Sequence, residues 1–378
     1  MIYLDYAAAA PVRKEVLEIV RSAEKYFANP SSRHDAGNRA RWMLDGAREK
    51  IKEIINASDK DRIIFTASGT ESINLALKGI AQTYKKKGNH IITSKIEHKA
   101  VLETCKFLER EGFKVTYLNV DKYGKVNLKE VEKAITAKTI LVSIMYANNE
   151  VGTIQSIQEI SAIARKRKVL FHTDACQAGF LQLDVQKLGI DLLTLNSNKI
   201  YGPKGAGLLY VREGVEIQPL IHGGGQELGL RSGTENVAAI AGFAKALGLA
   251  QPEKEKENKR LKELQDYFIS EVRKKIPNTQ LNGHPAERLS NNVHLSFAGV
   301  EAETVLSYLN QKNIFASAGS ACTANEIEVS HVLKAMKVAE KLARGSIRFS
   351  LGKYTDKKEL DKVITVLVQA INSLRKAS

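Results

Sequence analysis

A lysine and an aspartate separated by 25 positions are the residues of this chain best suited to chemistry. Asp174 follows the apolar run Val169-Leu-Phe171, and a carboxylate near the end of a buried strand needs a cationic partner. Lys199 can form a Schiff base with an aldehyde. A carboxylate that keeps a pyridine nitrogen protonated and such a lysine are the parts needed to use pyridoxal 5'-phosphate as an electron sink.

A third candidate, Cys322, lies far downstream in Ser317-Ala-Gly-Ser-Ala-Cys-Thr323. Small residues on both sides suit a loop, and a loop can carry a thiol to a substrate and then deliver it elsewhere. The thiolate is the reactive form of cysteine. The alternative is a buried structural cysteine. Together with the electron sink, a loop-borne thiol suggests an enzyme that takes up sulfur.

A phosphate site is predicted at Ser68-Gly69-Thr70, between an apolar run and a helical pattern. A helix N-terminus at this point presents backbone N–H groups and hydroxyls to an anion. An ordinary N-cap without a ligand is the alternative.

These motifs resemble those of the NifS/IscS cysteine desulfurases, within the class V aminotransferase group, and the resemblance runs nearly from end to end. It implies conversion of L-cysteine to L-alanine, with sulfur transferred to Cys322 as a persulfide. Three alternatives stay open: a selenocysteine lyase, another class V enzyme such as an aminotransferase, and a weakly active scaffold for sulfur acceptors.

The resemblance also implies roles for individual residues. The catalytic residues would be Lys199, Cys322 and His98, with His98 stacking on the pyridine ring and accepting the Cys322 proton. Arg348 would bind the substrate carboxylate next to Asn149, and Cys322 would be the only metal contact, as a transient iron–sulfur ligand. The residues implied to bind the cofactor are Ser68, Gly69, Thr70, His98, Asn149, Asp174, Gln177, Asn196, Asn198, Lys199 and Thr234.

Three positions carry further expectations. Relatives usually have histidine where this chain has Asn198 and a phosphate-binding serine where it has Asn196; an amide still donates hydrogen bonds, so cofactor binding should survive. Thr234, in a glycine-rich segment, is implied to complete the phosphate site across a homodimer interface. Lys204 is the competing lysine, in a Gly-Pro-Lys-Gly context typical of a turn.

Apolar runs alternate with helical patterns from about residue 62 to residue 210, which predicts an α/β fold with a mostly parallel sheet. Ligands of such sheets bind beyond the carboxyl ends of the strands. The resemblance makes this a fold-type I architecture, with a large cofactor-binding domain at 16–252 and a smaller α+β domain made of 1–15 and 253–378. The highly charged start of the second part reads as a helix that connects the domains.

The amino-acid composition limits the compartment, the membrane topology and the kinds of partner that we expect. Three cysteines among 378 residues are too few for a disulfide framework, so we expect a cytoplasmic protein. No apolar stretch approaches the length of a membrane span. A net charge of +15 is compatible with an acidic partner, but no RNA-binding signature accompanies it, so direct nucleic-acid binding is not expected. The expected partners are an iron–sulfur scaffold protein or another sulfur acceptor.

Overall fold

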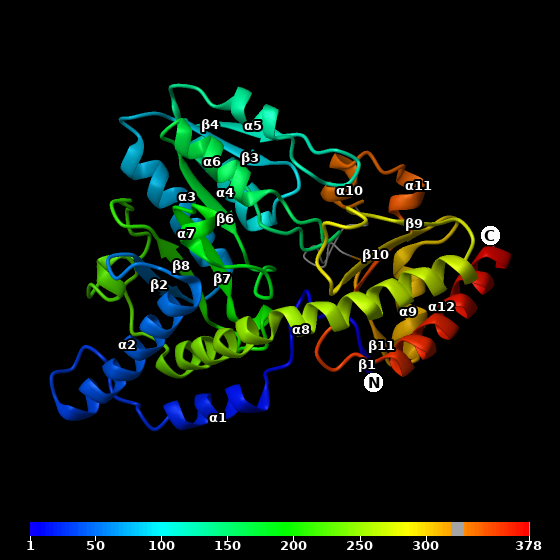
Figure 1. Ribbon diagram of the computed structural model, residues 1–378, viewed down its shortest axis with the longest axis horizontal. Coiled ribbons are helices and arrows are strands. Elements are labelled where there is room, and N and C mark those ends of the chain that lie inside the picture. Colours follow the sequence, from blue (N-terminus) through cyan, green and yellow to red (C-terminus); the bar gives the residue numbers. More distant parts are fainter. Residues whose placement is uncertain (319–328, 378) are drawn as a thin grey trace.

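The computed structural model describes residues 1–318 and 329–377. Figure 1 shows two bodies: a larger one built on a broad sheet, and a smaller one close to both chain termini. A long helix, α8 (Val237–Lys275), runs along both bodies and joins them (Figure 1). Within the described ranges, no helix is both long and apolar enough to cross a membrane.

The broad sheet has seven strands, in the spatial order β2-β8-β7-β6-β5-β3-β4. Their bounds in chain order are β2 (Arg62–Thr66), β3 (His90–Ser94), β4 (Lys114–Leu118), β5 (Thr139–Ser143), β6 (Leu170–Asp174), β7 (Leu192–Asn196) and β8 (Gly207–Val211). All neighbouring pairs from β4 to β7 are parallel, whereas β8 runs antiparallel to both of its neighbours. This mostly parallel sheet confirms the predicted fold class.

Helices cover both faces of the broad sheet, which explains why its strands are apolar runs and not alternating patterns. Successive side chains of a strand point to opposite faces, and Ile63 and Ile64 of β2 accordingly enter different apolar clusters. The Ile64 cluster includes residues of α3 and α4, and the Ile63 cluster includes residues of α2, α6 and α8. Besides α8, the helices of this body are α1 (Lys14–Ala23), α2 (Asp35–Ile55), α3 (Gly69–Tyr84), α4 (Lys99–Arg110), α5 (Leu128–Ala134), α6 (Ile157–Lys166) and α7 (Val185–Leu188).

The smaller body has β10 (Asn292–Phe297) at its centre, antiparallel to β9 (Thr279–Leu281) and β12 (Ser346–Ser350). Strand β1 (Ile2–Tyr3), at the N-terminus, pairs in parallel with β11 (Ile314–Phe315). The start of the chain therefore packs against the C-terminal part of the chain. The remaining helical elements are η1 (Ser197–Lys199), η2 (Glu227–Gly229), α9 (Ala302–Gln311), α10 (His331–Ala335), α11 (Glu340–Ala343) and the 21-residue α12 (Lys357–Ala377).

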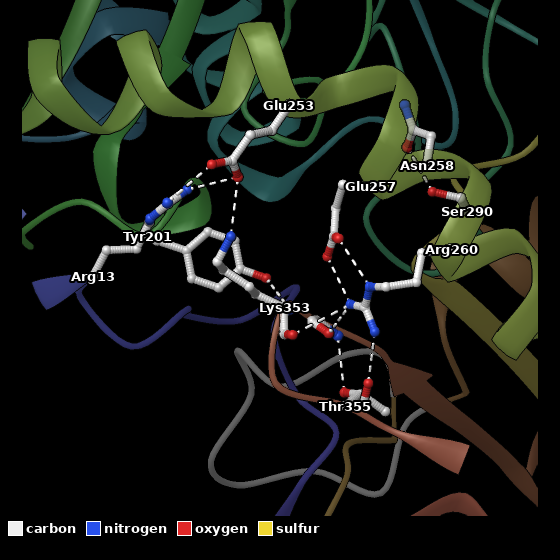
Figure 2. Close-up of polar contacts among 10 residues, drawn as sticks. Arg13, Tyr201, Glu253, Glu257, Asn258, Arg260, Ser290, Lys353 and Thr355 are labelled. Carbon is white, nitrogen blue, oxygen red and sulfur yellow. Dashed lines mark hydrogen bonds and ion pairs between the residues drawn. The ribbon is translucent and has the colours of Figure 1, made fainter. Parts of the chain in front are cut away.

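A polar network fastens the loop after β12 to α8 and to the larger body (Figure 2). Glu253 of α8 accepts hydrogen bonds from both terminal nitrogens of Arg13, at 2.8 and 3.0 Å, and from Lys353 Nζ at 3.0 Å. The backbone N–H of Lys353 donates to the hydroxyl of Tyr201 at 2.7 Å. Arg260 donates to three carbonyls of the same loop. These contacts set the position of β12 relative to the segment around Tyr201.

Candidate functional site

A cavity of about 390 Å³ opens at the carboxyl ends of the parallel strands. Asp174 is the last residue of β6 and Asn196 the last of β7, while α3 begins beside them. Arg348 of β12 reaches the same space from the smaller body. The residues predicted from sequence that line this cavity are Gly69, Thr70, His98, Asn149, Asp174, Gln177, Asn196, Lys199 and Arg348.

At the start of α3, a ligand can approach the backbone N–H groups of the helix closely. The hydroxyl of Ser68 accepts the N–H of Glu71 at 3.2 Å and caps the helix. A Cβ atom at Gly69 would lie 2.6 Å from Cys176 Sγ, so any larger residue there would have to displace that sulfur. The first N–H groups of this 16-residue helix can therefore bind an anion beside Gly69. Ser68 itself does not line the cavity.

Asp174 lies in an almost dry environment, with 6% of its surface exposed. Its Oδ1 accepts the backbone N–H of Cys176 at 3.0 Å. Two residues earlier, burial lowers the pKa of His172 to about 4, so this ring is neutral. A buried carboxylate in such surroundings favours a cationic ligand group. Burial, followed by the charge of Asp174, raises the pKa of the Cys176 thiol, which fits a packing role.

Lys199 is held by the N-terminal segment of the chain. Its Nζ donates to the carbonyl of Ala7 at 2.8 Å and also to the carbonyl of Ala8. Gln177 Nε2 donates to the same Ala7 carbonyl at 2.9 Å. Ala7 and Ala8 carry no polar side chain, so the sequence held no signal for this contribution.

The hydrogen bond made by His98 defines its tautomer. Nδ1 accepts the N–H of Ala100 at 3.1 Å and caps α4, so the proton of the neutral ring is on Nε2. Burial lowers the pKa of His98, which keeps the ring neutral. In this state Nε2 donates a hydrogen bond. To accept the proton of a thiol, as the sequence led us to expect, the ring would have to give up its cap.

Glu97, next to His98, is a buried acid that the sequence analysis did not single out. Its carboxyl group accepts hydrogen bonds from Ser94 Oγ and from the backbone N–H of Met145. Burial raises the pKa of Glu97 to about 8. Glu97 is thus a protonated carboxylic acid at neutral pH, and it adds no negative charge beside Asp174.

Arg348 is the cationic group that the smaller body brings to the cavity. Its side chain is 3% exposed, and Nη1 donates to the carbonyl of Asn149 at 2.9 Å. Nη2 donates to Asp5 Oδ1 at 2.7 Å. The planar fork of an arginine suits a carboxylate ligand.

Comparison with known proteins agrees with this geometry. The family model for class-V aminotransferases matches residues 2–363. The chain belongs to the class-V aminotransferase family. A curated relative, cysteine desulfurase IscS of Dictyoglomus turgidum, is 52% identical over 100% of this chain and 96% of its own length. The IscS of Methanosarcina thermophila is 49% identical over 100% and 93%. A solved structure titled NifS-like protein has a TM-score of 0.93 and 38% identity, covering 98% of this chain and 99% of its own.

Enzymes of the class-V aminotransferase family use pyridoxal phosphate, and the donor set of the cavity fits this cofactor. A lysine, a buried carboxylate and a helix N-terminus face one space, and its volume lies in the range of small-molecule sites. The exposed Lys204 does not line the cavity, which leaves Lys199 as the candidate for cofactor attachment.

Besides Ser68, two residues implied by the family resemblance do not line this cavity, and Cys322 is not among the described residues. Asn198 does not line the cavity, and its Oδ1 is buried without a hydrogen-bond partner in the described chain. Thr234 is exposed and also lies outside the cavity lining. Cys322 lies outside the described residues. The described chain that leads toward it ends close to Arg348, whose backbone exchanges two hydrogen bonds with Ser317.

Proposed function

We propose that this protein is a pyridoxal-phosphate-dependent cysteine desulfurase that converts L-cysteine to L-alanine. The observation that carries the proposal is the meeting of Lys199, Asp174 and Arg348 around one cavity, in a chain that is half identical to curated cysteine desulfurases. A lysine and a carboxylate serve a pyridine cofactor, and an arginine selects a substrate that carries a carboxylate.

Each side of the cavity has its own task. When bound, the cofactor supplies an electron sink for the bond pair at the substrate Cα. Lys199 would hold the cofactor and move the Cα proton, and Asp174 would pair with the ring nitrogen. Gln177 would donate a hydrogen bond to the phenolic oxygen, and His98 would stack on the ring.

The start of α3 would hold the phosphate of the cofactor. Backbone N–H groups at Gly69 and Thr70 would donate to the phosphate oxygens, and Ser68, which caps the helix from outside the cavity lining, would supply a further hydroxyl donor. Asn196, at the end of β7, supplies an amide in place of the usual serine. The substrate carboxylate lies against Arg348 and Asn149.

Sulfur transfer needs a nucleophile that can accept sulfur, and we assign this role to Cys322. Its thiolate forms a bond with the sulfur of L-cysteine as the carbon–sulfur bond breaks, and the electron pair of that bond returns to the carbon side. Protonation of the carbon then gives L-alanine, and Cys322 carries a persulfide. Neutral His98, with its proton on Nε2 and with Nδ1 engaged by the N–H of Ala100, donates a hydrogen bond and does not accept a proton; hence another group must receive the thiol proton.

Mass spectrometry after incubation with L-cysteine tests this function directly. We expect the intact protein to gain the mass of sulfur and peptide mapping to place it on Cys322. The Cys322→Ser variant should bind the cofactor and gain no sulfur, because a hydroxyl is scarcely ionised at neutral pH. Cys105→Ser is the matched control, since Cys105 is fully buried in α4 and burial raises its thiol pKa to about 12. Alanine formation by Cys322→Ser, or sulfur found on Cys105, would contradict the assignment.

The setting of this activity is also part of the proposal. The protein works as a cytoplasmic homodimer in which Thr234 of one subunit completes the phosphate site of the other. Exposed large apolar side chains support such an interface: Phe27 is 89% exposed, Trp42 71% and Leu228 64%. The sulfur acceptor is an iron–sulfur scaffold protein or another carrier, toward which Cys322 acts as a transient iron–sulfur ligand; nucleic acid is not a direct partner.

A further inference from the structure

We propose that Asp5 is a positioning residue that fixes the guanidinium group of Arg348 for the substrate carboxylate. The inference rests on the proposed function, because it takes Arg348 as the group that binds the carboxylate of L-cysteine. Asp5 does not line the cavity, so it acts on a ligand without touching it.

The contacts of Arg348 leave part of its hydrogen-bonding capacity available. A guanidinium group carries five N–H donors. Asp5 Oδ1 accepts one from Nη2 at 2.7 Å, and the Asn149 carbonyl accepts one from Nη1 at 2.9 Å. Nε is buried without a partner in the described chain. Two protein acceptors therefore fix the orientation of the Arg348 guanidinium plane. The other N–H donors of this group stay available for a ligand oxygen.

Asp5 is itself held by β12, the strand that carries Arg348. Asp5 forms a parallel bridge with Ser350, and the N–H of Ser350 donates to the carbonyl of Leu4 at 2.7 Å. Arg348 and Ser350 are two residues apart on a strand, so their side chains point to the same face. The hydroxyl of Tyr3 donates to the Asp5 carbonyl at 3.0 Å. The pair is partly shielded from water, with side-chain exposures of 3% for Arg348 and 21% for Asp5.

A carboxylate behind Arg348 has two opposing effects on a ligand carboxylate. Its negative charge repels the ligand, whereas its oxygen keeps the fork from adopting other rotamers. Asparagine retains an oxygen acceptor and removes the charge, and alanine removes both. Comparison of Asp5→Asn with Asp5→Ala therefore isolates the contribution of the hydrogen bond.

The test measures the half-saturating L-cysteine concentration of both variants and the equilibrium affinity for L-alanine by calorimetry. We expect Asp5→Ala to require about tenfold more ligand than Asp5→Asn, which corresponds to about 1.4 kcal/mol. Turnover at saturation should be similar in the two. Cysteamine, which has the amine and thiol of cysteine but no carboxylate, should inhibit both variants equally. Asp45→Asn and Asp45→Ala, at an exposed position of α2, control for loss of an aspartate.

Equal ligand requirements of the two Asp5 variants would overturn the proposal. It would also be overturned if cysteamine inhibited Asp5→Ala more weakly than Asp5→Asn by the same factor as for L-cysteine. Arg348→Lys removes the guanidinium group. In this background, Asp5→Asn and Asp5→Ala should require the same ligand concentration; a remaining difference would show that Asp5 acts by another route. If the wild-type protein binds L-alanine but forms none from L-cysteine, the proposed function fails, while the L-alanine affinities still decide the role of Asp5.

Discussion

Burial controls the charge of the individual residues around the cavity. His98 and His172 are neutral because their charged forms are poorly solvated, and Glu97 holds a proton for the same reason. Among the described residues, the carboxylate and cationic side chains that line the cavity are Asp174, Lys199 and Arg348, with Asp5 behind the arginine. A cavity with so few ionised groups leaves each of them a distinct role.

Glu97→Gln should make stability less dependent on pH. The folded-state pKa of Glu97 is about 8, above the ordinary value of 4.5, so the folded protein binds this proton more tightly. The resulting stabilisation is complete below pH 4.5 and is lost as pH rises toward 8, by about 1.4 kcal/mol per pH unit. Glutamine can keep the acceptor for Met145 N–H and does not titrate.

We therefore expect the wild type to lose about 2–3 kcal/mol more than Glu97→Gln between pH 5.5 and 7.5, measured by urea unfolding. Glu103→Gln is the matched control, because this α4 side chain is 63% exposed. The same slope in Glu97→Gln as in the wild type would show that another group causes it.

Asn198→His tests the main departure of this chain from its relatives. The buried Oδ1 of Asn198 has no partner in the described chain, so the amide is not required by a local hydrogen bond of that atom. A histidine restores a group that can donate and accept protons near neutral pH. We expect turnover to rise severalfold and its pH profile to change, while the absorbance of bound cofactor stays the same. An unchanged rate and profile would make Asn198 a neutral replacement.

At the scale of elements, the sequence predicted the strands and helices that a local pattern of apolar residues encodes. The apolar runs at Arg62–Thr66, His90–Ser94 and Gly207–Val211, in the stretch predicted to alternate between strands and helices, are strands, because strands buried on both faces leave a continuous apolar signal. The role of the N-terminal segment was not predictable in this way. Asp5 meets Arg348 across 343 positions, and no local pattern encodes such a contact.

The network in Figure 2 connects elements, and Glu253→Gln should weaken it. Glu253 pairs with Arg13, whose side chain is only 5% exposed, and with Lys353. Loss of the negative charge leaves Arg13 paired only with the half-exposed Glu15 among the described residues. Because Glu253 is itself 37% exposed, we expect about 1–2 kcal/mol of destabilisation, below the cost for a fully buried pair.

Thermal or urea unfolding of Glu253→Gln measures this cost. Glu255→Gln, on the same helix at an exposed position, should leave stability unchanged. If both variants unfold alike, the network contributes nothing to the attachment of the loop after β12.

At the scale of the whole molecule, the described chain supplies most of the predicted site but not all of it. The family match confirms the resemblance from which the roles were drawn, yet Thr234 is exposed and does not line the cavity. A second subunit is the physical means by which an exposed residue could reach a phosphate. The sequence could suggest this arrangement only through family resemblance, because one chain carries no signal for a contact between two.

Mixing two inactive variants tests whether Thr234 acts across the dimer. A Lys199→Ala subunit lacks the cofactor lysine, and a Thr234→Ala subunit lacks the threonine that its partner needs. In a mixed dimer, the Thr234→Ala subunit has its own lysine and receives an intact threonine from the Lys199→Ala subunit. One complete site per mixed dimer follows, and random reassembly of a two-fold symmetric dimer makes half of the dimers mixed.

We expect an equimolar mixture, reassembled after mild dissociation, to regain about one quarter of the wild-type activity and of the cofactor absorbance. Each variant alone should regain neither, and a mixture of Lys199→Ala with itself under the same treatment controls for refolding. If Thr234 serves the site of its own subunit, no dimer contains a complete site, and the mixture will be no more active than its components. That result would remove the threonine from the partner's phosphate site.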